Sequence, residues 1–215
     1  MPSPIGHAIA GVAVSWAAQA IAPGLRVMAP DSKVGPTDPR VPDLQVGPTY
    51  LRRHALTFAC VALAVLPDID LLYMPVHRRM THSVGAVLVV FIVATAVTGW
   101  VTRRFGARAV AIGLVCAAAV ASHVVMDWLS LDAQLPYGVQ ALWPFSDQWY
   151  IAPRAIFPGT ERREPFAAWS QAANARAVVW EVGVMGPIAV AAGAMRRYRS
   201  RGRTSARDDQ PRPSA

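Results

Sequence analysis

Apolar residues gather into five segments separated by polar stretches, and this pattern defines the expected fold. The third and fourth segments are close to the length that an α-helix needs to cross a bilayer. The second reaches that length only if it continues through Pro-Asp-Ile-Asp to Leu72. The pattern predicts an all-α membrane bundle of about five transmembrane helices, at residues 5–22, 55–66, 84–101, 109–126 and 178–195.

The composition supports a membrane protein. Of the 215 residues, 53% are hydrophobic and 16% are charged, whereas soluble domains have about 25% charged residues. Cys60 and Cys116 both lie within apolar segments, which excludes a secreted disulfide framework. The tail from Arg196 has almost nothing to bury, so we expect a membrane-embedded domain over residues 1–195 and a disordered basic tail over 196–215.

The net charge is +8, and the distribution of the basic residues predicts how the protein is oriented in the membrane. If the segments alternate in direction, the 23–53 loop, the 102–108 turn and the tail share one face and carry 15 of the 21 basic residues. The positive-inside rule makes that face, and the C-terminus, cytoplasmic, and no direct nucleic-acid binding is expected. The residues before the first segment contain no Lys or Arg, so we expect an uncleaved helix rather than a secretory signal.

Ionisable side chains collect on the opposite, extracytoplasmic face. Such groups are costly beside an apolar span and usually face a partner or a wet cavity. Their shared membrane depth therefore predicts a single site. The residues are His7, Asp68, Asp70, His77, His82, His123 and Asp127.

The residue types and spacings fit a divalent metal. His123 and Asp127 are four residues apart and share one face of a helix. Asp68 and Asp70 follow Pro67, where the chain is expected to leave the helix. Imidazole with carboxylate suits Zn²⁺, Mn²⁺ or Fe²⁺. Seven potential ligands exceed the three of a typical catalytic zinc, which leaves open two ions sharing a carboxylate.

Each pair alone has a simpler explanation. The two aspartates could only end a helix, His77 and His82 could be interfacial, and His123 and Asp127 could form an intrahelical hydrogen bond. Their coincidence on one face favours a shared site. His54 belongs to the other face and is expected to be an ordinary polar residue.

Three further features accompany these residues. Glu181 begins the fifth segment at the same face and is expected to act as a ligand or base, or to snorkel to the interface. Arg78 matches phosphate oxygens as an anion clamp, although Arg78 and Arg79 could instead contact lipid headgroups. The aromatic stretch 142–150 is typical of an interfacial belt and could also wall the site.

The order of these motifs resembles a known family. Gly6-His7, Leu-Pro-Asp-Ile-Asp, His-Arg-x-x-Thr-His-Ser, Ser-His-x-x-x-Asp and a later Trp-Pro-Phe-Ser are similar to bacterial and archaeal membrane-bound, metal-dependent hydrolases, also described as LexA-binding, inner-membrane-associated hydrolases. The resemblance covers about residues 5–150 and implies a multi-pass protein of the bacterial inner membrane. The metal ligands that it implies are His7, Asp68, Asp70, His82, His123 and Asp127.

The expected function is metal-assisted hydrolysis, with Zn²⁺ as the leading metal and His77 as a ligand or general acid/base. The family's distant similarity to zinc-dependent phospholipase C implies a phosphoester substrate, and the position at headgroup depth favours a phospholipid. One alternative is a membrane-anchored regulator or scaffold that binds a LexA-type partner, with a structural metal. A metal transporter is disfavoured because the third segment is nearly free of polar groups.

Overall fold

The computed structural model describes residues 1–25, 48–70, 78–132, 137–161, 164 and 166–208. The prediction of an all-α protein with five long helices is confirmed. Within the described residues the remaining regular structure is a short 3-10 helix at Pro23–Leu25, a 3-10 turn over residues 66–70 and two isolated β-bridges. The helices are α1 (Pro4–Ile21), α2 (Pro48–Val65), α3 (Val84–Thr102), α4 (Ala107–Trp128) and α5 (Ala168–Asp208).

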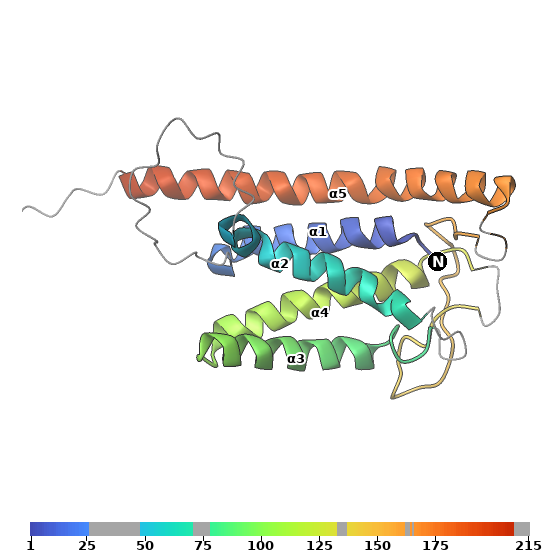
Figure 1. Ribbon diagram of the computed structural model, residues 1–215, viewed down its shortest axis with the longest axis horizontal. Coiled ribbons are helices and arrows are strands. Elements are labelled where there is room, and N and C mark those ends of the chain that lie inside the picture. Colours follow the sequence, from blue (N-terminus) through green and yellow to red (C-terminus); the bar gives the residue numbers. More distant parts are fainter. Residues whose placement is uncertain (26–47, 71–77, 133–136, 162–163, 165, 209–215) are drawn as a thin grey trace, which may run out of the picture.

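The five helices lie along a common direction and alternate in the sense in which the chain runs (Figure 1). The N-terminus, the end of α2, the start of α3, the end of α4 and the start of α5 therefore meet at one end of the bundle. This is the end at which the sequence placed its ionisable residues. Alternation alone brings these segments together, because each helix reverses the direction of the one before it.

The helices differ in how deeply they are buried. α1, α2 and α4 pack against one another, whereas α5 packs on α1 and α3 packs on α4 at the flanks. In the apolar window of α4, 56% of the residues are buried, against 11% in α3. The outer faces of α3 and α5 expose large apolar side chains such as Ile92 and Val179. Apolar faces of this kind are expected where a helix contacts lipid.

Four helices within the described residues, α1, α3, α4 and α5, are long and apolar enough to cross a membrane. α2 is less apolar, because its first turns carry Arg52, Arg53 and His54. It begins at Pro48 rather than near Ala55 and ends at Val65. The predicted extension of this segment beyond Asp70 lies outside the described residues.

α5 is longer at both ends than the apolar segment that predicts it. It begins at Ala168 and continues past residue 195 to Asp208, where the sequence predicted disorder. Arginine contacts explain part of the extension. The Arg196 guanidinium donates to Gln19 Oε1 at 3.2 Å and lies 5.0 Å from the Trp16 ring centre, and Arg199 donates to the Ala20 carbonyl at 3.2 Å.

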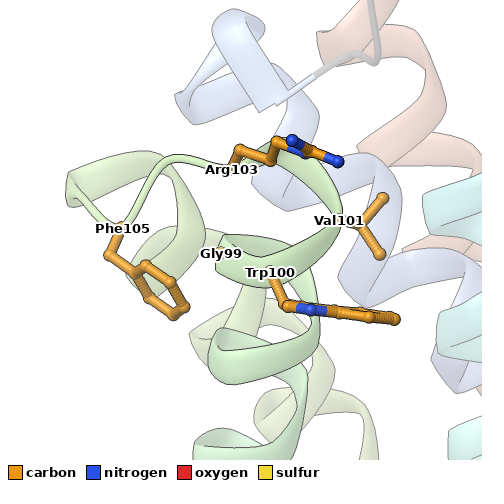
Figure 2. A pocket seen from close by; sticks show the side chains of 5 residues that line it. All are labelled: Gly99, Trp100, Val101, Arg103 and Phe105. Carbon is orange, nitrogen blue, oxygen red and sulfur yellow. The ribbon is translucent and has the colours of Figure 1, made fainter.

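The turn between α3 and α4 closes tightly at the other end of the bundle. Arg103 ends α3 in the left-handed conformation, with φ of 53°. The Phe105 ring folds back over Gly99 (Figure 2), and a Cβ atom at residue 99 would lie 2.3 Å from that ring. Glycine is therefore required there. Trp100 and Phe105 are exposed, as expected for aromatic residues at a membrane interface.

Candidate metal centre

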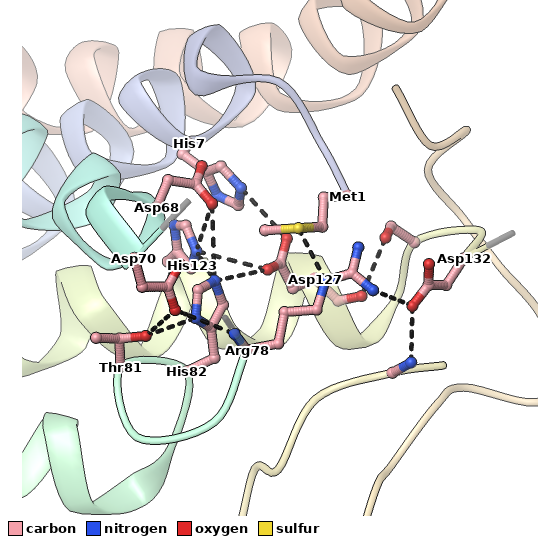
Figure 3. Close-up of polar contacts among 12 residues, drawn as sticks. Met1, His7, Asp68, Asp70, Arg78, Thr81, His82, His123, Asp127 and Asp132 are labelled. Carbon is pink, nitrogen blue, oxygen red and sulfur yellow. Dashed lines mark hydrogen bonds and ion pairs between the residues drawn. The ribbon is translucent and has the colours of Figure 1, made fainter. Parts of the chain in front are cut away.

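Four side chains at or near the ends of three helices converge at the end of the bundle that holds the N-terminus (Figure 3). Asp68 follows α2, His82 precedes α3, and His123 and Asp127 lie on the last turns of α4. One ligand atom from each of the four lies within 4.8 Å of the others. We call these four residues the metal group.

Local sequence positions each member of the metal group. Pro67 lies in the 3-10 turn over residues 66–70, which carries Asp68 off the end of α2. Ser83 caps α3 by accepting a hydrogen bond from the Ala86 amide at 3.3 Å, and this fixes the residue before it, His82. On α4 the four-residue spacing presents an imidazole and a carboxylate on one face, as the sequence predicted.

The separations between ligand atoms suit a single ion. His82 Nε2 lies 3.1 Å from Asp127 Oδ2 and 3.7 Å from Asp68 Oδ1. His123 Nε2 lies 3.5 and 3.7 Å from the same two oxygens, and the two Nε2 atoms are 3.0 Å apart. A tetrahedral ion with bonds of about 2.1 Å separates its ligand atoms by roughly 3.4 Å. The metal group is therefore close to the required dimensions.

Hydrogen bonds on the outer side of each imidazole indicate its tautomer. His123 Nδ1 lies 2.7 Å from the Ala64 carbonyl, which can only accept, so Nδ1 donates. His82 Nδ1 lies 3.2 Å from Asp70 Oδ2. Both Nε2 atoms point into the metal group, where their lone pairs would bind a cation once any proton there is lost. Outer contacts of this kind are usual for histidines that bind metals.

The centre of the group has more negative charge than the described residues compensate. His82 and His123 are fully buried. Asp68 Oδ1 and both oxygens of Asp127 have no hydrogen-bond partner in the part of the chain that the structure describes. Burial lowers the pKa of His82, but contacts with Asp127, Asp68 and Asp70 raise it more, so it lies well above the usual histidine value. A buried cluster that attracts a proton this strongly is suited to a divalent cation.

His7 lies directly beside the metal group. Its ring stacks on His123 with centroids 3.8 Å apart, and its Nε2 is 3.4 Å from Asp127 Oδ1. Both nitrogens of His7 are buried and have no hydrogen-bond partner among the described residues. Asp127 thus presents Oδ2 to the metal group and Oδ1 to His7, the arrangement that a carboxylate shared between two ions would require.

Asp70 occupies a different position from Asp68. It contacts the outer nitrogen of His82 and also accepts hydrogen bonds from the Arg78 amide, at 3.0 Å, and from the Thr81 hydroxyl. Thr81 Oγ1 in turn lies 2.9 Å from His82 Nδ1. Asp70 is not among the four members of the metal group. The structure therefore places the predicted ligand Asp70 behind His82, where a carboxylate orients the ring.

Arg78 is buried against the loop after α4 rather than open to water. Its guanidinium forms an ion pair with Asp132, its Nε lies 2.9 Å from Met1 Sδ, and its backbone has φ of 64° (Figure 3). Asp132 also accepts a hydrogen bond from the Gly138 amide at 2.7 Å. Asp132 therefore compensates the charge of Arg78, the residue that the sequence predicted to bind an anion. Arg79 is exposed.

Glu181 lies apart from the metal group but is fully buried. Its carboxylate accepts hydrogen bonds from the Ser3 amide, at 2.9 and 3.0 Å, and from the Ser3 hydroxyl. A Cβ atom at Gly6 would lie 2.5 Å from Glu181 Oε2, so the close approach depends on glycine. Glu181 thus joins α5 to the start of α1. His77 lies outside the described residues.

Sequence reasoning missed several contacts of the site. Thr81 was visible only as part of a motif, and Asp132 was not among the predicted site residues. The Ala64 carbonyl carries no sequence signal, because any residue at that position supplies one. The charge complementarity of Arg78 and Asp132 was the one available clue, but 54 residues separate the two side chains.

Comparisons with known proteins agree with the membrane fold. No curated protein and no solved structure matches the chain. A family described as YdjM inner membrane protein matches residues 1–199, nearly the whole sequence, including every residue of the metal group. Together with the four apolar helices, this match supports a membrane location. The chain belongs to the YdjM inner membrane protein family.

Proposed function

We propose that the protein is an integral-membrane, metal-dependent hydrolase that acts on phosphoesters. The observation that carries the proposal is the convergence of two imidazole Nε2 atoms with two carboxylates in a buried space, where three carboxylate oxygens have no hydrogen-bond partner within the described chain. Leaving such groups uncompensated is costly, and a divalent ion would satisfy all of them at once.

Each residue of the centre has a role in this proposal. Asp68, His82, His123 and Asp127 would hold one ion, for which Zn²⁺ is the leading candidate. His7 with Asp127 Oδ1 would contribute to a second ion. Asp70 and the Ala64 carbonyl orient the two imidazoles. A bound ion supplies the chemistry, by activating water and neutralising charge that develops on the substrate oxygens.

The topology in the proposal is multi-pass, with the C-terminus in the cytoplasm and the metal centre at the other face. The alternating helices and the distribution of basic residues support it. Single cysteines at Ala155 and Gly202, both exposed positions, provide the test in a Cys60→Ser, Cys116→Ser background. A membrane-impermeant maleimide added to spheroplasts should label Ala155→Cys and not Gly202→Cys. The reverse labelling would place the centre in the cytoplasm.

A phospholipid or other lipid phosphoester is the proposed substrate class. The metal group lies at the ends of α2 and α4, where a spanning helix reaches the headgroup region. Lipid phosphates are concentrated at that depth, and the exposed Arg79 guanidinium suits an anionic headgroup.

The test combines metal analysis with hydrolysis. Wild-type protein is purified, its metal content is measured, and it is incubated with mixed-lipid vesicles and with soluble phosphodiesters while products are followed by mass spectrometry. Asp68→Asn should lose the metal and the activity. His54→Ala is the control, because residue 54 lies in the first half of α2, 14 residues before Asp68 along the chain, and it should retain both.

Two results would count against the proposal. Equal metal content in wild type and Asp68→Asn would show that the group does not bind the ion. Metal bound by wild type without hydrolysis of any phosphoester would favour the alternative of a regulator or scaffold for a LexA-type partner, in which the metal serves structure alone.

A further inference from the structure

An apolar groove runs along the membrane-spanning part of the molecule between α2, α3 and α4. Its volume is about 890 Å³. It exists because α3 packs on α4 and stands off from α2. The α3 wall consists largely of valines whose side chains are about half exposed, Val89, Val93 and Val97 among them. The polar lining residues Thr98, Thr102 and Arg108 lie toward the end away from the metal group.

The groove and the metal group are built from the same three helices. On α2 the lining ends at Leu66, two residues before Asp68. On α3 it begins at Val89, two turns after His82, and its floor on α4 includes Cys116, two turns before His123. Each wall therefore leads, within two helical turns, to a residue of the metal group.

The dimensions of the groove fit a hydrocarbon chain. From Val89 to Thr102 the α3 wall rises by roughly 20 Å, whereas half of a bilayer hydrocarbon core is about 15 Å thick. In the bilayer, the molecules that surround an open apolar groove are lipids.

We propose that this groove holds the hydrocarbon chain of a lipid substrate whose phosphate lies at the metal group. This inference rests on the proposed hydrolase function and extends it: the substrate enters sideways from the bilayer between α2 and α3. The hydrocarbon chain of the lipid then contributes to substrate binding. A soluble phosphodiester with the same headgroup lacks this contact and is held only at its reacting end.

Filling the groove tests the proposal. Val93 lines the groove and is 53% exposed, whereas its neighbour Ile92 is 62% exposed and is not among the lining residues. Val93→Trp and Ile92→Trp therefore place the same bulky ring on adjacent residues of one helix. Both variants are reconstituted in vesicles of phosphatidylethanolamine and phosphatidylglycerol, after their metal content has been matched to that of wild type.

The readout is the dependence on chain length. Val93→Trp should lower turnover of dioleoyl lipids at least tenfold and change turnover of dibutyryl lipids by less than twofold. Ile92→Trp should change neither. Equal turnover of dioleoyl lipids by the two variants, or an equal loss on both substrates in Val93→Trp, would overturn the inference.

Photolabelling separates this inference from the proposed activity. A phospholipid with a diazirine at the end of one acyl chain should label wild type near Val97, and the label should disappear in Val93→Trp but persist in Ile92→Trp. If wild type hydrolyses no lipid, the hydrolase proposal fails while this labelling pattern still supports a chain in the groove. Equal labelling of both variants, or labelling near Leu66 instead of Val97, would overturn the binding mode.

Discussion

Two of the buried polar clusters in the bundle differ in whether the described part of the chain satisfies their hydrogen bonds. Ser15, Gln19 and Thr57 form the hydroxyl–amide cluster, in which Ser15 Oγ lies 2.9 Å from Thr57 Oγ1 and Gln19 Nε2 donates to Ser15 at 2.8 Å. Arg196 completes it by donating to Gln19 Oε1. In the metal group, by contrast, carboxylate oxygens and imidazole lone pairs face one another.

This difference in hydrogen bonding distinguishes the hydroxyl–amide cluster, which is structural, from the metal group, which is the candidate binding site. Buried polar groups in an apolar environment need partners, and the hydroxyl–amide cluster finds them across α1, α2 and α5. It therefore connects helices and requires nothing else. The metal group is equally buried, but three of its carboxylate oxygens have no hydrogen-bond partner among the described residues, which is why we propose that it holds a cation. Unsatisfied groups are thus a better guide to function here than burial or polarity alone.

The largest effect should follow Asp127→Asn, because Asp127 contacts His7, His82 and His123. We expect metal affinity to fall by more than about 100-fold, beyond the 10–100-fold typical of outer contacts. Competition with a chelator, followed by elemental analysis, measures it. Ser15→Ala, in the hydroxyl–amide cluster, is the matched control and should retain full metal content. Similar losses in the two variants would remove the distinction between the clusters.

Metal removal should destabilise the wild-type protein and leave Asp127→Asn unchanged. Metal at 100 times its dissociation constant stabilises by about 2.7 kcal/mol. For a chain of this size we expect a chelator to lower the unfolding temperature by roughly 5–10 °C in detergent. Thermal unfolding with and without chelator provides the measurement. An equal chelator effect in Asp127→Asn would mean that the stabilising ion binds elsewhere.

Asp70→Asn should have an intermediate effect, since Asp70 contacts the outer nitrogen of His82 and is not a member of the metal group. Metal affinity is expected to fall about 10–100-fold, less than in Asp68→Asn. Titration of the metal-free proteins with Zn²⁺ would compare the two. If Asp70→Asn proves the weaker binder, Asp70 is itself a ligand, as the family resemblance implied.

Ser15→Ala should affect stability alone. Removing the hydroxyl leaves Gln19 and Thr57 each short of one hydrogen bond, at a cost of about 1 kcal/mol. The unfolding temperature should drop by roughly 2–4 °C, with no change in the effect of chelator. A changed response to chelator would show that the two clusters are energetically coupled.

The smallest effect on the metal should be that of Glu181→Gln. The amide keeps an acceptor for Ser3, and Glu181 lies outside the metal group. We expect metal affinity within about twofold of wild type and a loss of stability of about 1 kcal/mol. A large loss of metal would restore Glu181 to the role of ligand that the sequence allowed.

The fold was largely predictable, because apolar windows of spanning length and alternating direction leave few arrangements. That alternation also placed His7, Asp68, His82, His123 and Asp127 at one end before any contact was known. The sequence could not show which of these residues belong to the metal group and which lie behind it. Asp68 and Asp70 look equivalent in it, and only the turn over residues 66–70 puts them on different sides of His82.

Contacts between distant segments escaped prediction for a different reason. Ser3 and Glu181 are 178 residues apart, and Arg78 and Asp132 are 54 apart. No periodicity links such pairs, so their pairing depends on how the helices pack. The extension of α5 beyond residue 195 likewise depends on Arg196 and Arg199 contacting α1, which a composition argument treats as an isolated polar tail.

The placement of the metal group along the chain has a consequence for biosynthesis. Its four residues lie between positions 68 and 127, and α5 begins only at Ala168. The complete ligand set therefore leaves the ribosome before the last helix has been made. Translation delivers first the carboxylate after α2, then the imidazole before α3, and finally the pair on α4. A nascent chain that has reached the end of α4 already contains all four residues of the metal group, and α5 then packs on α1.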